Sequence, residues 1–239
     1  TRLYERNETS STPSIITLPT NSNYWWRARS NDGFEYSSWS VPISFYLRDP
    51  WSIRVPGELS TIQAAIDIAS IGDTVLVAPG HYRGYIRFGA KSVRLVSEAG
   101  PLVTFLEGPT LGTTPEQALI TFVGHALAPS EISGFTITSN NSDHNCLIGE
   151  STSPVIRNNI FTGLVAGTAN VRISGSDVVI VKNIFDNNKN VWASVGVDYG
   201  KTTILDNTFY RNDGGFYSNS QQTMAINNIV TQSNRYGIY

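Results

Sequence analysis

Polar side chains recur at one fixed spacing near the end of the chain, and their types could support sugar chemistry. β-Elimination of a uronate sugar needs a cation that neutralises the substrate carboxylate and a group that abstracts the C5 proton. Lys, Arg and Tyr side chains beside acids offer both. The candidate catalytic residues occupy equivalent positions of a 24-residue repeat, as in 206 − 182 = 24. They are Lys182 and Asp206, which share one position, Asp186 and Tyr210, which share a second, and Arg211, which shares a third with Asn187.

Two other interpretations of these residues are open. A pair of Asp side chains could instead catalyse glycoside hydrolysis. The structural interpretation, which the sequence favours, makes Lys182 and Asp206 an exposed salt bridge worth under about 1 kcal/mol. Asp198, Tyr199 and Lys201 would extend this polar face. Exposed aromatic rings could also stack on a polysaccharide, and the candidate binding residues are Tyr199, Tyr210 and Tyr217.

Composition argues against several classes of function. The net charge is −2 and no run of Lys or Arg marks a basic patch, so nucleic acid is not an expected partner. No long apolar run occurs, which predicts no membrane insertion in this segment. The single Cys146 excludes an internal disulfide framework, and His81, His125 and His144 share no ligand spacing. We predict no metal site and no cofactor; calcium binding is left open, although no Asp-rich calcium pattern occurs.

A repeated segment must position the candidate residues. Four stretches share one frame, in which an apolar residue is followed by two variable residues, Asn, one further residue and then Phe or Val: residues 154–161, 178–185, 202–209 and 223–230. The Asn residues lie at steps of 183 − 159 = 24, 207 − 183 = 24 and 228 − 207 = 21. A period of this length on β-prone sequence indicates a solenoid in which each repeat is one turn of a coil.

Stacking of the coils assigns roles within the repeat. Strands about 4.8 Å apart bring residues one period apart into contact. We expect one internal column through Ile180, another through Phe185 and a second strand of each coil near Val195, which together form a bipartite core. The corner between the two columns needs a left-handed residue, and Asn tolerates that conformation. Its amide can also bond to the Asn of the next coil, which predicts a structural ladder of Asn159, Asn183, Asn207 and Asn228.

A helix is expected before the first coil, over residues 60–70. Ser60 as N-cap and Gln63 three residues later form a capping box. The apolar stripe of this helix consists of Ile62, Ala65, Ile66 and Ala69. Short strands follow, separated by Gly and Pro: residues 74–78, 85–88, 93–96, 103–106 and 119–123.

The same region resembles a known superfold. Thr61-Ile-Gln-Ala-Ala-Ile, then Gly72-Asp-Thr-Val-Leu-Val-Ala-Pro-Gly and Tyr82, are similar to the start of right-handed parallel β-helix proteins of the pectate lyase-like superfold. The resemblance covers residues 52–239. It implies an all-β, right-handed parallel β-helix whose N-terminal end is capped by a helix.

The first 48 residues predict strands of another kind. Residues 24–29 alternate between two faces, as in a half-buried strand. Leu18-Pro-Thr followed by Tyr24 resembles the tyrosine corner of a fibronectin type III domain, and Ser37-Ser-Trp-Ser is similar to its last strands. We expect residues 1–48 to be the C-terminal half of such a β-sandwich and residues 49–239 to be the β-helix, with a linker around Leu47-Arg-Asp-Pro.

Function is expected outside the cell. Only 15% of residues are charged, which suits an extracellular or cell-surface all-β protein. Residues 236–239 begin another coil, so we expect a fragment of a larger protein whose solenoid continues. The motifs of pectate lyases, polygalacturonases, pectin methylesterases and alginate epimerases are absent. We therefore favour a non-catalytic adhesion module that binds polysaccharide or a cell-surface protein; the alternative is a polysaccharide lyase or glycoside hydrolase acting on acidic polysaccharide.

Overall fold

The computed structural model describes residues 18–108, 118–124, 126, 128–138, 145–166, 169–175, 177–190, 192–220, 222–234 and 236–238. The chain divides into two compact units, Thr1–Asp49 and Pro50–Tyr239. His125 and His144 lie outside the described residues.

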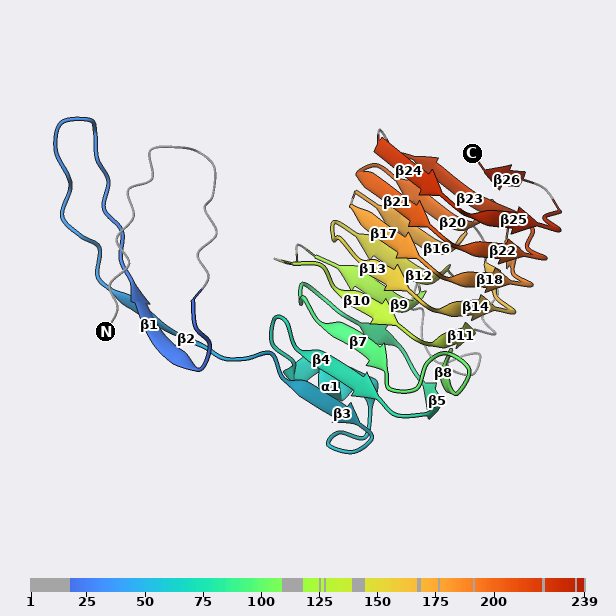
Figure 1. The fold of residues 1–239 in the computed structure, drawn as a ribbon, viewed down its shortest axis with the longest axis horizontal. Helices are drawn as coiled ribbons and strands as arrows, with labels where there is room; N and C mark the ends of the chain where they lie inside the picture. The colour runs from blue at the N-terminus through green and yellow to red at the C-terminus, as the bar shows by residue number, and fades with distance from the viewer. Residues whose placement is uncertain are drawn as a thin grey trace. The chain divides into compact units, whose positions relative to one another are not determined.

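The first unit contains a small antiparallel sheet. Strand β1 (Ser22–Trp26) pairs with β2 (Ile43–Leu47) (Figure 1). Tyr24 lies opposite Phe45, and their ring centroids are 5.6 Å apart. The Tyr24 hydroxyl donates to the Pro19 carbonyl at 2.5 Å. Within the described residues this unit is a two-stranded sheet, and the fibronectin type III-like half-sandwich stays a prediction.

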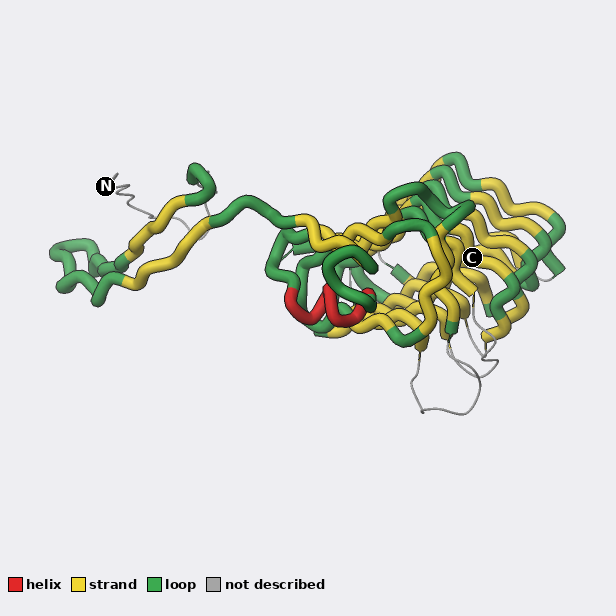
Figure 2. Tube along the Cα trace, turned by 90° about the horizontal axis from the view of Figure 1, so that it is seen from below, coloured by secondary structure: helices red, strands yellow, loops and turns green. Residues whose placement is uncertain are grey.

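The second unit is a solenoid whose strands form three parallel sheets (Figures 1 and 2). The first sheet has eight strands: β3 (Ser52–Val55), β4 (Thr74–Val77), β7 (Arg94–Ser97), β10 (Glu131–Ser133), β13 (Val155–Arg157), β17 (Val178–Val181), β21 (Lys201–Leu205) and β24 (Gln222–Ile226). The second has seven: β5 (Gly80–Arg83), β8 (Thr104–Glu107), β11 (Thr136–Thr138), β14 (Ile160–Thr162), β18 (Ile184–Asp186), β22 (Thr208–Tyr210) and β25 (Ile229–Thr231).

The third sheet also has seven strands: β6 (Ile86–Arg87), β9 (Ala118–Val123), β12 (Asn145–Glu150), β16 (Ala169–Ser174), β20 (Ala193–Asp198), β23 (Gly214–Asn219) and β26 (Tyr236–Ile238). A short parallel pair, β15 (Val165–Ala166) with β19 (Lys189–Asn190), lies between the second and third sheets along the chain. A full coil therefore adds one strand to each sheet.

Each coil has three main strands, whereas the repeat predicts two. The repeat frame spans two of them, as in β17 and β18, because the chain turns just before Asn183. Strand β5 is missing from the predicted strands because Pro79-Gly80 reads as a turn. The core consequently has three walls and is not bipartite.

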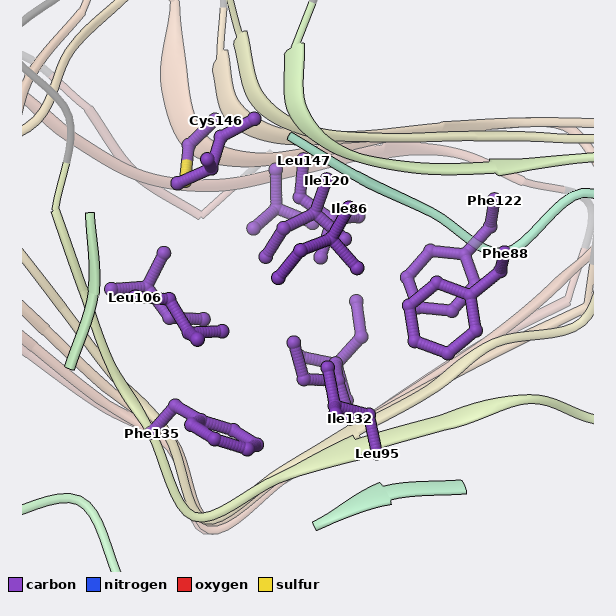
Figure 3. Packing of buried hydrophobic residues seen from close by; sticks show 14 of the residues in the cluster. Ile86, Phe88, Leu95, Leu106, Ile120, Phe122, Ile132, Phe135, Cys146 and Leu147 are labelled. Carbon is purple, nitrogen blue, oxygen red and sulfur yellow. The ribbon is translucent and has the colours of Figure 1, made fainter. Parts of the chain in front are cut away.

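The internal columns are confirmed. Ile156, Ile180 and Ile204 pair in register across the first sheet and are fully buried. In the second sheet the ring centroids of Phe185 lie 4.8 Å from those of both Phe161 and Phe209. Figure 3 shows the same stacking nearer the start of the solenoid, where Leu95 lies against Ile132, Phe88 against Phe122, and Ile86 against Ile120.

Helix α1 (Ile62–Ile68) lies against β3, β4 and β6 and buries the predicted apolar stripe. Its N-cap is Thr61, whose side chain accepts a hydrogen bond from the Ala64 N–H at 3.2 Å. The predicted capping box of Ser60 and Gln63 is therefore wrong. The Gln63 amide oxygen instead accepts a bond from the Arg87 N–H at 2.8 Å, so this side chain ties the helix to β6.

Candidate functional site

The predicted asparagine ladder is present and belongs to the scaffold. Asn183 is 1% exposed, and its Nδ2 donates to Asn207 Oδ1 at 3.1 Å and to the Ile156 carbonyl at 2.8 Å. Its Oδ1 accepts from the Asn159 N–H at 3.0 Å and from Asn159 Nδ2 at 3.2 Å. Asn207 bonds to Asn228 in the same way. These amide groups are hydrogen-bonded within the protein, so they are not available to a ligand.

The ladder residues do not adopt the left-handed conformation, contrary to the prediction. The preceding residue does, with φ of 55° at Lys182 and 54° at Asp206. This arrangement lets the corner side chain project outward while the next side chain, the Asn, turns inward to bond. Among the ion pairs of the described residues none joins Lys182 to Asp206, so their equal spacing reflects the corner and not the expected salt bridge.

A second amide stack follows the second sheet, and the sequence analysis missed it. Asn188 and Asn212 are buried, and the Asn188 N–H donates to Asn212 Oδ1 at 3.0 Å. Asn188 Nδ2 donates to the Phe161 carbonyl at 2.9 Å. The residues before them, Asn187 and Arg211, are left-handed with φ of 52° and 54°. The step of 212 − 188 = 24 was the available signal.

The remaining candidates lie on different parts of the solenoid. Tyr199 is a left-handed corner residue between β20 and β21 and is 65% exposed. Tyr217 lies on β23 of the third sheet, opposite Gly196. Asp198 is also in the third sheet, and its Oδ2 lies 4.0 Å from Arg172 Nε. Lys201 lies on β21 of the first sheet, so the expected single polar face is split among the three sheets and their corners.

Three of the candidate catalytic residues do meet, on the outer side of the second sheet. Asp186 of β18 lies opposite Tyr210 of β22, as their equal slots predict. Arg211 donates to Asp186 Oδ1 through Nε at 3.1 Å and through Nη2 at 2.9 Å, and to Oδ2 through Nη2 at 3.0 Å. The Arg211 Cζ lies 4.7 Å from the Tyr210 ring centroid. We call Asp186, Tyr210 and Arg211 the Arg211 cluster.

The electrostatics of the Arg211 cluster limit what it can do. The hydrogen bonds that Arg211 donates to Asp186 raise the pKa of the Arg211 guanidinium, so this group stays charged. Both Asp186 carboxylate oxygens accept bonds from that guanidinium. The cation and the acid thus neutralise each other. Within the described part of the chain Arg211 Nη1 has no protein acceptor, which leaves its N–H groups for a ligand.

An apolar strip runs beside the Arg211 cluster on the same sheet. Ile184, Thr208 and Ile229 lie opposite one another in successive coils. Ile184 is 43% and Ile229 is 58% exposed. The strip therefore places exposed apolar side chains beside the polar groups of the Arg211 cluster.

A second ionic group lies at the other end of this sheet. His81 Nδ1 is 2.7 Å from Glu107 Oε1, and Arg83 Nε donates to Glu107 Oε2 at 2.7 Å. These contacts, the one with His81 first, lower the pKa of Glu107. The His81 ring stacks on the Phe105 ring, with 4.4 Å between the ring centroids. Sequence reasoning missed this group although Arg83 and Glu107 pair in register and lie 107 − 83 = 24 residues apart, so the repeat step was an available signal for that pair. His81 lies 107 − 81 = 26 residues from Glu107 and so falls outside that step.

The described residues offer neither a metal-binding cluster nor a membrane-spanning helix. They contain no group of three or more His, Cys, Asp and Glu side chains that could hold a metal ion. They also contain no helix that is long and apolar enough to span a membrane.

Comparison with known proteins identifies the fold. A family model described as "Right handed beta helix region" matches residues 123–239. A crystal structure of pectin methylesterase in complex with hexasaccharide VII is similar at 13% identity, with a TM-score of 0.45, over 79% of this chain and 80% of that chain. A mutant pectin methylesterase in complex with hexasaccharide IV is similar at 13% identity and a TM-score of 0.43, over 71% and 70%. No curated protein matches the chain. With three parallel sheets, the second unit is a right-handed parallel β-helix.

Proposed function

We propose that this protein is a non-catalytic β-helix module that binds polysaccharide at the Arg211 cluster. The observation that carries the proposal is the fixed position of the Arg211 guanidinium, which is held by three hydrogen bonds to Asp186 and by the Tyr210 ring. A guanidinium that is already ordered loses little conformational freedom when it binds.

Sugar rings match the groups on this face. The Arg211 Nη1 donors and the Tyr210 hydroxyl can bond to sugar hydroxyls, while Ile184 and Ile229 offer apolar contact for the C–H faces of the rings. Strands pinned by the two amide stacks support the site, so its groups keep their spacing without a ligand. A polymer could contact several coils at once.

Catalysis is the second candidate, because the cluster brings Arg, Tyr and Asp together as β-elimination requires. The internal pairing argues against it. Asp186 uses both oxygens on Arg211, so the cluster holds neither an unpaired cation nor a free carboxylate, and the Tyr210 hydroxyl is the one group left that could take a proton. We therefore place binding ahead of polysaccharide lyase or glycoside hydrolase activity.

Two further proposals concern where the protein acts and the origin of its first 48 residues. We infer an extracellular or cell-surface location from the low content of charged residues. We also retain the proposal that residues 1–48 derive from a fibronectin type III-like domain; the bond from the Tyr24 hydroxyl to the Pro19 carbonyl supports it. The matching family model does not extend to these residues.

The test combines binding and turnover on one panel of polymers: pectin, alginate, chondroitin and neutral dextran. Arg211→Asn should weaken binding about tenfold, since a hydrogen bond to a charged group contributes about 1.5–3 kcal/mol. Asn suits the left-handed corner. Lys182→Asn is the matched control, because it removes the same charge at a corner with the same φ, and it should bind like the native protein.

The outcomes separate the candidates. Equal binding by Arg211→Asn and the native protein on every polymer contradicts the proposal. Formation of unsaturated product, detected by absorbance and lost in Arg211→Asn, establishes the lyase alternative instead.

A further inference from the structure

The small sheet of the first unit has two unlike sides. Side chains alternate along a strand, so Tyr24 and Phe45 share one side while Trp25 and Tyr46 share the other. The first side also carries Ser22, Trp26, Ile43 and Leu47, and Trp26 is 51% exposed. The second side carries exposed aromatic rings, with Trp25 at 61% and Tyr46 at 56% exposure.

The second side continues past the strands into a stack of guanidinium groups and rings. Arg27 and Arg29 extend the alternation of β1, and their Cζ atoms lie 4.3 Å and 4.4 Å from the Trp39 ring centroid. Arg29 also lies 3.9 Å from the Tyr36 ring centroid. We call this set the Trp–Arg strip, and it consists of Tyr46, Trp25, Arg27, Trp39, Arg29 and Tyr36.

Serine hydroxyls hold the strip in place. The Ser40 N–H donates to the Ala28 carbonyl at 2.7 Å, and Ser40 Oγ accepts from the Ala28 N–H at 2.9 Å. Ser37 makes the same two contacts with Ser30, at 2.9 Å and 3.0 Å. The segment that carries Trp39 is therefore fixed to the segment that carries the two arginines. This explains the chemistry of the Ser37-Ser-Trp-Ser motif.

Arg27 differs from the other ordered arginines. Arg211 and Arg83 each donate to a carboxylate, whereas Arg27 has neither an ion pair nor a hydrogen-bond acceptor within the described part of the chain. Stacking on Trp39 occupies the flat face of its guanidinium. The N–H groups point from the edge of that plane, so the geometry leaves a fork that fits a carboxylate or sulfate.

An unpaired cation favours an anionic ligand at the strip. Within the described part of the chain Arg27 has no carboxylate partner. The Asp32 carboxylate accepts the N–H groups of Phe34 and Glu35, which hold it in its own turn. These bonds, the one to Glu35 first, lower the pKa of Asp32, so this carboxylate keeps its negative charge.

We propose that the Trp–Arg strip binds an acidic polysaccharide, with Arg27 on a carboxylate or sulfate and the Trp25 and Tyr46 rings stacked on sugar rings. A polymer whose sugar rings have apolar C–H faces and carry repeating acidic groups matches a row of cations and aromatic rings. The site lies in the first unit and is independent of the Arg211 cluster, where the cation is already neutralised.

The experiment uses the full chain and three polysaccharide probes, which are polygalacturonate, dextran sulfate and neutral dextran. Polyglutamate, an acidic polypeptide, is measured beside them. Arg27→Gln should weaken binding of both anionic probes by about tenfold or more, since a charged hydrogen bond contributes about 1.5–3 kcal/mol. Trp25→Ala should weaken it by a smaller factor. The remaining affinity should depend less on salt, because an ionic contact is lost. Binding of neutral dextran should not change in Arg27→Gln.

Two controls make the result decisive. Lys182→Asn removes one positive charge elsewhere and should retain native binding of the anionic probes. Arg27→Lys keeps the charge but loses the planar fork, and it should bind between the native protein and Arg27→Gln. Circular dichroism and the urea midpoint of each variant check that the fold is intact. Trp25→Phe, which keeps a ring, replaces Trp25→Ala if that variant fails the check, and it should bind like the native protein.

Three results would overturn the proposal. The first is native affinity of Arg27→Gln for both anionic probes. The second is an equal loss in Lys182→Asn, which would show a response to net charge alone. The third is tighter binding of polyglutamate than of either anionic polysaccharide, which would indicate a protein partner. Loss of dextran binding in Arg211→Asn alone tests the other site, so the two proposals fail separately.

Discussion

The ladder amide of Asn183 offers the sharpest test of how the solenoid is held together. Substitution by Leu keeps the approximate size of the side chain and removes both its donor and its acceptor. The Asn159 N–H then loses its acceptor, since Asn183 Oδ1 is the group it bonds to at 3.0 Å. The Ile156 carbonyl loses a donor at 2.8 Å. Asn207 Oδ1 keeps one partner, the Asn183 backbone N–H at 2.9 Å.

The magnitude follows from this inventory. One buried N–H without an acceptor costs about 1–3 kcal/mol, and the other losses are partly compensated. We therefore expect Asn183→Leu to lower the free energy of unfolding by about 1–3 kcal/mol. For a domain of this size each 1 kcal/mol shifts the Tm by about 2–4 °C. Urea denaturation should show a lower midpoint with an unchanged slope.

Two further variants make the ladder test specific. Asn219→Leu alters an exposed asparagine outside the ladder and should change the free energy of unfolding by less than about 0.5 kcal/mol. Asn183→Asp keeps the acceptor, but its second oxygen faces the Ile156 carbonyl unless it is protonated. Its pKa in the folded state should therefore exceed the unfolded value, so stability is retained below the unfolded pKa and lost as the pH rises through the folded pKa.

Failure of either pattern would contradict the ladder as a source of stability. A native midpoint for Asn183→Leu would show that the buried N–H finds another partner. A pH-independent midpoint difference between Asn183→Asp and the native protein would show that the lost donor does not matter.

Two smaller predictions concern titratable groups. Glu107 has a lowered pKa in the folded state, so its ion pairs stabilise the fold above its ordinary pKa of 4.5, and this stability is lost as the pH falls through the lowered pKa. Thermal melts between pH 3 and pH 7 should show that Glu107→Gln removes this part of the acid dependence, which is worth under about 1 kcal/mol. An identical acid dependence in the variant would refute the pairing. Burial raises the pKa of the Cys146 thiol, so native protein should resist iodoacetamide and react only after unfolding; fast labelling of the native state would show that the thiol is accessible.

The exterior was predicted less well than the interior, and the Arg211 cluster shows why. Asp186 and Tyr210 occupy equal slots, so their contact follows from the period. Arg211 occupies the slot of Asn187, and the sequence analysis pairs those two. In the structure Arg211 turns back to Asp186, 211 − 186 = 25 residues away, because a left-handed corner redirects its side chain. No repeat rule states where a long exposed side chain points.

The Trp–Arg strip illustrates the same limit in the first unit. Alternation along residues 24–29 places Arg27 and Arg29 on one side of a strand. That Trp39 packs against both depends on hydrogen bonds from Ser37 and Ser40, which link segments about ten residues apart. The motif was visible, but its role required the contacts.

The sequence by itself determined the coil period, the Ile and Phe columns and the asparagine ladder. Parallel strands stack at one fixed spacing, so residues one period apart must touch and a repeated residue becomes a column. Only the tertiary structure decided that each coil has three main strands, which residue of each corner is left-handed, and which polar side chains meet outside. Those features depend on the direction in which each corner turns the chain, and periodicity carries no information about that direction.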